Sequence, residues 1–208
     1  MSFFENTRNP VGLGGKIMVA LMNLGHSPVA RWGLRFLELT PDAKVLDCGC
    51  GGGANIKRLL KLCPKGTVRG IDYSPVSVEK SKKVNKAAVA RGRCDVLCAS
   101  VAELPFESEQ FDLVTAFETV YFWPDLPRCF CEVGRVLKPG GTFCGCFYVK
   151  GEQKRTDWFV RHIYEKAGFF TPPYETVSSL KARLDGMYAD VDMGNLKSMA
   201  WFVCRKAG

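Results

Sequence analysis

Two aspartates and a group of glycines are the residues whose spacing points most directly to chemistry. Asp47 ends a short apolar run, glycines follow at 49 and 51–53, and Asp72 ends a second apolar run 19 residues after Gly53. Glycines let the backbone adopt positive φ and let a ligand approach without meeting a Cβ, while the start of a following helix presents free N–H groups. This spacing is typical of a nucleotide-type site, in which the second carboxylate binds a ribose diol.

Two ligands are possible at such a site, a dinucleotide and S-adenosylmethionine, and Asp47 distinguishes between them. A carboxylate before the first glycine repels a pyrophosphate. A cationic aminoacyl-sulfonium ligand tolerates it, and the amino group of that ligand can use it. The position of Asp47 therefore favours the sulfonium.

Alternating strand and helix patterns must position these residues. The helix after the glycines carries an apolar stripe at helical spacing, and Pro64 with Gly66 ends it. Ser74 with Pro75 begins a helix that we expect to reach Arg91. The alternation predicts a doubly wound α/β fold. The expected strands are 45–47, 67–71, 95–99, 111–117 and 142–149, with helices at 54–63, 74–91 and 124–137.

The order of these motifs resembles the class I S-adenosylmethionine-dependent methyltransferases. Residues 45–54 look like motif I of that family, and Asp72-Tyr73 matches the acidic residue after its second strand. The matching regions continue at 99–106, 111–125 and 137–141, and together they cover roughly residues 40–150. The most similar group includes the ubiquinone and menaquinone biosynthesis methyltransferases.

The resemblance implies a fold and a division of the chain. We expect a Rossmann-like, doubly wound, mostly parallel seven-stranded sheet with a terminal antiparallel strand. Residues 187–193 and 199–204 are expected to pair around Gly194-Asn195. Residues 1–40 would form an N-terminal arm and helical lid, and residues 41–208 the S-adenosylmethionine-binding domain.

The resemblance also implies cofactor contacts. Asp47 is expected at the amino group, Gly49 and Gly51 along the methionine part, and Asp72 at both ribose hydroxyls. Relatives often have an acidic residue where this chain has Ser100, so adenine recognition is expected to involve a weaker acceptor there. The remaining expected cofactor contacts are Tyr73, Val101 and Phe117.

Candidates on the acceptor side follow the fourth expected strand. Methyl transfer from a sulfonium is an in-line displacement that needs alignment in a dry pocket more than a covalent catalyst. Tyr121 and His26 are the candidate catalytic residues, and Glu118, Trp123 and Tyr148 are the candidate pocket residues.

The function expected from the family is methyl transfer from S-adenosylmethionine to a small-molecule acceptor, with O, N, S and C acceptors all open. Two alternatives remain: a nicotinamide-dependent oxidoreductase, and a non-catalytic module that binds S-adenosylmethionine or RNA.

Composition limits the partners. The formal net charge is +8, and basic residues gather at 80–93 without interleaved aromatic residues. We therefore interpret the cluster as a solvated helix face and expect no stable nucleic-acid partner. No stretch is long and apolar enough to span a membrane. We expect a cytoplasmic protein, and the oligomeric state stays open.

The ten cysteines form CxC pairs at 48/50, 129/131 and 144/146, and the chain has only two histidines. Because the usual zinc spacings are missing, no metal site is expected. Several of them, Cys63, Cys129, Cys144 and Cys146, fall on expected core positions, and we interpret these as small buried hydrophobes with free thiols in a reducing compartment, with a soft-metal role as the alternative.

Overall fold

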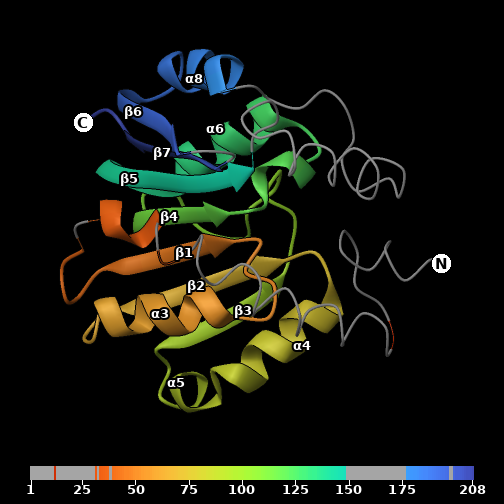
Figure 1. Cartoon of the computed structure of the whole chain (residues 1–208). Helices are drawn as coiled ribbons and strands as arrows, with labels where there is room; N and C mark the ends of the chain where they lie inside the picture. The colour runs from red at the N-terminus through yellow and green to blue at the C-terminus, as the bar shows by residue number, and fades with distance from the viewer. Residues whose placement is uncertain (1–11, 13–30, 32, 38, 149–176, 197–198) are drawn as a thin grey trace.

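The described part of the computed structural model builds one seven-stranded sheet in the order β3-β2-β1-β4-β5-β7-β6 (Figure 1). It comprises residues 12, 31, 33–37, 39–148, 177–196 and 199–208. The five neighbouring strands β3, β2, β1, β4 and β5 pair in parallel, whereas β7 is antiparallel to both β5 and β6. The expected mostly parallel sheet with an antiparallel terminal pair is confirmed. The strands are β1 (Lys44–Cys48), β2 (Thr67–Asp72), β3 (Cys94–Cys98), β4 (Phe111–Phe117), β5 (Leu137–Tyr148), β6 (Ala189–Leu196) and β7 (Met199–Arg205).

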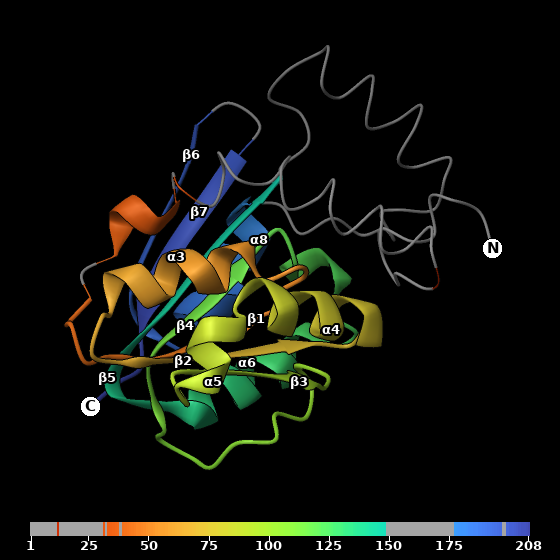
Figure 2. The same ribbon diagram turned by 90° about the horizontal axis from the view of Figure 1, so that it is seen from below.

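Helices cover both faces of the sheet. Seen from below, α3, α4 and α5 lie on one side of β1 to β3, and α6 lies on the other (Figure 2). Each face has its own apolar core, because the parallel strands are buried on both sides. Ile56 and Leu59 of α3 belong to one core, while Phe130 and Val133 of α6 join Leu180 of α8 in the other. The helices are η2 (Leu34–Phe36), α3 (Ala54–Leu62), α4 (Pro75–Val84), α5 (Lys86–Ala90), η3 (Val120–Phe122), α6 (Leu126–Val136) and α8 (Val177–Asp185).

The cysteines follow this core. Eight of the ten are buried, among them Cys63, Cys129, Cys144 and Cys146, and all ten have free thiols. Burial raises the pKa of these buried thiols, so they stay protonated near neutral pH. Their predicted place in the core is confirmed. Among the described helices, none combines the length and the apolar character needed to cross a bilayer.

The structure corrects three expected element boundaries. The helix expected from Ser74 to Arg91 breaks at Asn85 into α4 and α5, because the Asn85 side chain turns inward to bond other segments. Strand β5 begins at Leu137, and no separate turn precedes it. Its pairing with β4 shifts register between Leu137 and Thr142, where Gly140 has φ +70°. Strand β6 runs through Gly194 to Leu196, so the expected turn at Gly194-Asn195 is wrong.

Candidate functional site

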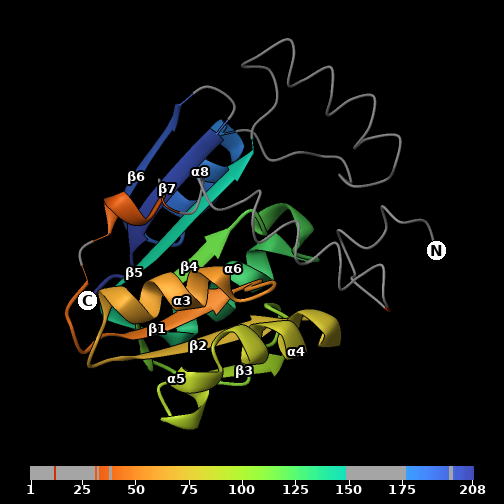
Figure 3. The ribbon, with the colours of Figure 1, turned by 60° about the horizontal axis from the view of Figure 1, so that its bottom comes forward.

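The site residues gather where the strand order reverses between β1 and β4. The chain proceeds from β1 outward to β2 and β3 and then returns to the other side of β1. The carboxyl ends of these parallel strands meet at one edge of the sheet, near the start of α3 and α4 (Figure 3). In open α/β sheets ligands bind in the crevice at this switch point.

Asp47 is a buried carboxyl with one free oxygen. Its side chain is 1% exposed, and the Thr115 hydroxyl donates to Oδ1 at 2.8 Å. Oδ2 is buried and has no hydrogen-bond partner among the described residues. Burial, reinforced by the nearby charge of Asp72, raises the pKa of Asp47 to about 7. A buried oxygen of this kind is suited to accept a hydrogen bond from a cationic ligand.

Asp72 ties the glycine loop to the second strand. Its Oδ2 accepts the Gly51 N–H at 2.9 Å, and its Oδ1 accepts the Ser74 N–H at 2.9 Å. Burial raises the pKa of Asp72, while the two backbone N–H groups act in the opposite direction. The Ser77 side chain adds a third hydrogen bond to this carboxyl, which leaves acceptor capacity for a ligand hydroxyl.

Gly51 and Gly53 do different things in the loop. Both have positive φ, +50° and +79°. A Cβ on Gly53 would lie 2.4 Å from Ser81 Oγ and 2.6 Å from Asn85 Nδ2, so Gly53 permits close packing on α4. A Cβ on Gly51 would meet no atom of the described residues within 4 Å. Open space beside Gly51 is what close approach of a ligand requires.

The adenine-side candidates lie at the ends of β2 and β3. The Tyr73 side chain is 46% exposed. Ser100 is exposed, and its Oγ accepts the Ala102 N–H at 3.2 Å. The Val101 side chain is buried in the core on the α6 face, so the side chain itself serves packing.

The acceptor-side candidates Glu118 and Tyr121 are brought together directly after β4. The Tyr121 hydroxyl donates to Glu118 Oε2 at 2.9 Å, while Oε1 is buried without a partner among the described residues. Burial raises the pKa of Glu118 to about 7. Glu118 also has φ +59°, a conformation that a side chain with a Cβ rarely adopts. Such an outlier at a partly buried carboxyl residue is typical of a functional site. Phe117, the preceding residue, is buried at the end of β4.

The other three candidates are Trp123, Tyr148 and His26. The Trp123 ring stacks on Phe143 at 6.2 Å between centroids and meets the Phe130 edge at 5.9 Å. Tyr148 is the last residue of β5. His26 and most of the expected lid, residues 1–40, lie outside the described residues.

Three supporting residues were not identified from the sequence. Thr115 pairs with Asp47 in the strand register, Thr119 Oγ1 donates to the Cys48 carbonyl at 3.0 Å, and the Asn85 amide donates to the Gly53 carbonyl at 3.0 Å. Each contact joins segments more than 30 residues apart. Only the buried position of Thr115 in an apolar strand was a usable signal in the sequence.

Comparison with known proteins shows that the segment containing these residues is similar to methyltransferases. A methyltransferase domain model matches residues 46–145. Cycloartenol-C-24-methyltransferase 1 of Oryza sativa subsp. japonica is 36% identical over 107 residues, which cover 51% of this chain and 31% of that protein. Squalene methyltransferase 1 of Botryococcus braunii is 34% identical over 108 residues, covering 52% and 28%. The match thus spans about a third of these curated relatives.

Solved structures show the same fold. The complex between the Haloferax volcanii Trm112 methyltransferase activator and the putative methyltransferase gives a TM-score of 0.77 at 18% identity, covering 91% of this chain and 94% of that one. Geranyl diphosphate C-methyltransferase from Streptomyces coelicolor A3(2) gives 0.70 at 15% identity, covering 87% and 76%. Residues 46–145 thus resemble a methyltransferase domain, and the seven-stranded sheet is the fold that these solved structures share.

Proposed function

We propose that this chain binds S-adenosylmethionine and transfers its methyl group to a carbon atom of a small apolar acceptor. The observation that carries the cofactor site is the unpartnered Oδ2 of buried Asp47, close in the chain to a glycine with open space at its Cα. Asp47 would hold the amino group, Gly51 would let the methionine part approach, and Asp72 would accept a ribose hydroxyl. Bound S-adenosylmethionine supplies an electrophilic methyl group on a sulfonium.

The acceptor class rests on Glu118 and on the relatives. The sequence relatives are named for C-methylation of sterols and methylation of squalene, both apolar molecules. A carbon acceptor that attacks with a π-electron pair is left with a positive charge and must lose a proton. Glu118 is partly buried, and its buried Oε1 has no partner among the described residues, so it is suited to stabilise that charge and to take the proton. Tyr121 holds the other oxygen and fixes the carboxylate.

Replacing Glu118 by Gln tests this role. The amide keeps the volume and an acceptor for Tyr121 but removes the charge and the basic site. We expect methyl transfer to fall on the order of 10²-fold or more, with affinity for S-adenosylhomocysteine unchanged. At saturating S-adenosylmethionine, where ionisation of Asp47 no longer limits cofactor binding, the wild-type rate should rise with pH through about 7 as Glu118 ionises, and the variant should lose that rise. The measurement is transfer of labelled methyl from S-adenosylmethionine into squalene and cycloartenol over a range of pH.

Glu79→Gln on the exposed face of α4 is the matched control and should behave as wild type. Equal turnover and an equal pH profile in Glu118→Gln would contradict the role of Glu118. Labelling of polar acceptors alone would contradict the apolar acceptor.

A further inference from the structure

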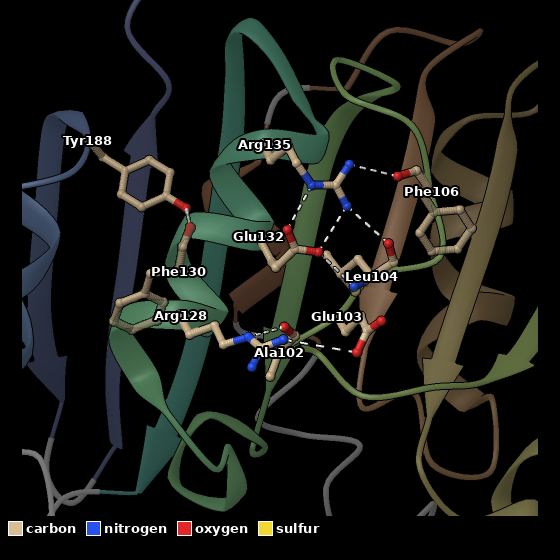
Figure 4. Close-up of polar contacts among 9 residues, drawn as sticks. All are labelled: Ala102, Glu103, Leu104, Phe106, Arg128, Phe130, Glu132, Arg135 and Tyr188. Carbon is tan, nitrogen blue, oxygen red and sulfur yellow. Dashed lines mark hydrogen bonds and ion pairs between the residues drawn. The ribbon is translucent and has the colours of Figure 1, made fainter.

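Side chains of α6 hold the loop between β3 and β4 (99–110), and the proposed function gives these contacts no role. It contains Ser100 and Val101, the positions expected to meet the adenine ring. Val101 and Leu104 are buried in the core on the α6 face, which fixes the side-chain surface of the loop but not its backbone groups. Those backbone groups are fixed by polar side chains of α6 (Figure 4).

Glu132 and Arg135, which we call the α6 clamp, bond each other and the loop together. Arg135 Nε lies 2.7 Å from Glu132 Oε1, and Arg135 Nη2 lies 2.9 Å from Oε2. Arg135 also donates from Nη1 to the Phe106 carbonyl at 2.7 Å and from Nη2 to the Leu104 carbonyl at 3.0 Å. Glu132 Oε2 accepts the Leu104 N–H at 2.7 Å. Three loop backbone groups are thereby held by one ion pair.

The pair is suited to this task. The Arg135 side chain is 34% exposed and the Glu132 side chain is 21% exposed, so solvent screens the attraction between them only in part. The hydrogen bond from Arg135 lowers the pKa of Glu132, which favours the ionised carboxylate that the pair needs. A planar guanidinium can bond a carboxylate and two carbonyls at once, which an ammonium cannot do in that geometry.

The need for such a clamp follows from Ser100. A hydroxyl is a weaker acceptor than a carboxylate, and this one already accepts the Ala102 N–H. Recognition of the adenine edge therefore depends more on backbone groups near Val101, and backbone groups recognise a ligand only where the loop holds them. The clamp begins three residues beyond Val101.

We propose that Glu132 and Arg135 are positioning residues of the cofactor site, which hold the β3–β4 loop so that its backbone meets the adenine of S-adenosylmethionine. They do not touch the ligand. Their contribution is specific to the adenine part, and the inference rests on the proposed cofactor.

The experiment compares two ligands that differ only in the adenine ring. S-Adenosylhomocysteine is titrated by calorimetry, and S-ribosylhomocysteine, which lacks adenine, by ligand-observed NMR. In Glu132→Gln and Arg135→Gln, affinity for the first should fall roughly tenfold, as expected when about one hydrogen bond is misplaced. Affinity for the second should not change. Arg135→Lys should lie between Arg135→Gln and wild type, because a lysine restores the charge but not the planar fork.

Tyr188→Phe is the matched control for damage to α6. Tyr188 donates to the Phe130 carbonyl of α6 at 2.7 Å, on the side of the helix away from the loop (Figure 4). This variant loses a buried hydrogen bond to the same helix but should bind both ligands as wild type does.

The outcomes separate the inference from the proposed function. If the wild type binds both ligands and the clamp variants bind both equally well, or lose both to the same degree, the clamp is not a positioning device for adenine. If the wild type binds neither ligand, the proposed function fails first and the inference falls with it.

Discussion

Asp47 and Glu118 are two residues that lower the stability of the fold but serve the proposed chemistry. Asp47 is buried and Glu118 is partly buried, and each has a buried oxygen with no partner among the described residues. Desolvation raises both pKa values to about 7. An unpartnered buried carboxylate destabilises a fold, so a protein keeps one where a ligand completes it. For Asp47 that ligand group is cationic, and for Glu118 it is the positive charge that develops on the acceptor.

Asp47→Asn should stabilise the ligand-free protein at high pH and weaken cofactor binding. In the unfolded chain Asp47 loses its proton near pH 4, whereas in the fold it keeps the proton until about pH 7. Its contribution to the free energy of unfolding is therefore fully present below about pH 4 and is lost as the pH rises to about 7. The asparagine does not titrate and keeps the hydrogen bond from Thr115. At pH 8 the free energy of unfolding of the variant should therefore exceed that of the wild type by on the order of 3 kcal/mol.

The measurements are urea denaturation at pH 5 and pH 8 and calorimetric titration with S-adenosylhomocysteine. Loss of a charged hydrogen bond should weaken binding roughly 10- to 100-fold. An unchanged affinity, or the same stability difference at both pH values, would contradict the role of Asp47.

At the residue scale the sequence predicted the two aspartates and the glycines but not their supports. Asp47 and Asp72 follow apolar runs and precede glycines, which is a local pattern. Thr115 lies beside Asp47 only after β4 pairs with β1, and no local pattern encodes that pairing. The positive φ of Glu118 is likewise set by the surrounding fold, since glutamate has no preference for it.

At the scale of elements, the loop between β1 and α3 separates a binding surface from a packing surface. Its Gly51 faces open space, and its Gly53 packs on Ser81 and Asn85 of the α4–α5 junction. The Asn85 amide, bonded to both the Gly53 and Ser81 carbonyls, fixes the loop to that junction. Replacing each glycine by alanine should therefore affect different properties.

Gly51→Ala should lower affinity for S-adenosylhomocysteine at least tenfold at a modest stability cost, roughly 1–2 kcal/mol for the left-handed backbone. Gly53→Ala carries the same backbone cost plus a methyl group 2.8 Å from the Ser81 Cα. It should lose about 3 kcal/mol or more. Urea denaturation and calorimetry measure the two effects.

Gly92→Ala supplies the control, because Gly92 has φ +69° and a Cβ there would meet no described residue within 4 Å, yet Gly92 follows α5 away from the site. It should share the backbone cost of Gly51→Ala and bind normally. If Gly51→Ala bound as well as Gly92→Ala, the open space at Gly51 would not be the cofactor path.

Apolar periodicity predicted elements well and their ends less well. The stripe at Cys129, Phe130 and Val133 predicted α6, and all three side chains are buried there. The break at Asn85 went unpredicted because its cause is a bond to Gly53, 32 residues away. The sequence 137–141 reads as a turn, but pairing of Leu137 with Phe111 draws it into β5.

At the scale of the whole molecule, the site exists only when the sheet is assembled. Its candidate residues come from segments near 47–53, 72–73, 100–101 and 117–121, and the β1–β2 and β1–β4 pairings bring three of these segments together. The resemblance predicted this assembly because the family motifs occur in the family order. The acceptor could not be predicted in the same way, since its pocket depends on positions such as Glu118 that the fold sets individually.

The most direct test of the central claim is calorimetric titration of the purified protein with S-adenosylmethionine, S-adenosylhomocysteine and NAD. The Asp72→Ala variant and the control Asp95→Ala, on the half-exposed face of β3, are titrated in parallel. We predict that wild type and Asp95→Ala bind the first two ligands and not NAD, and that Asp72→Ala loses this binding. Binding of NAD in preference, or no binding of either S-adenosyl ligand, would contradict the account.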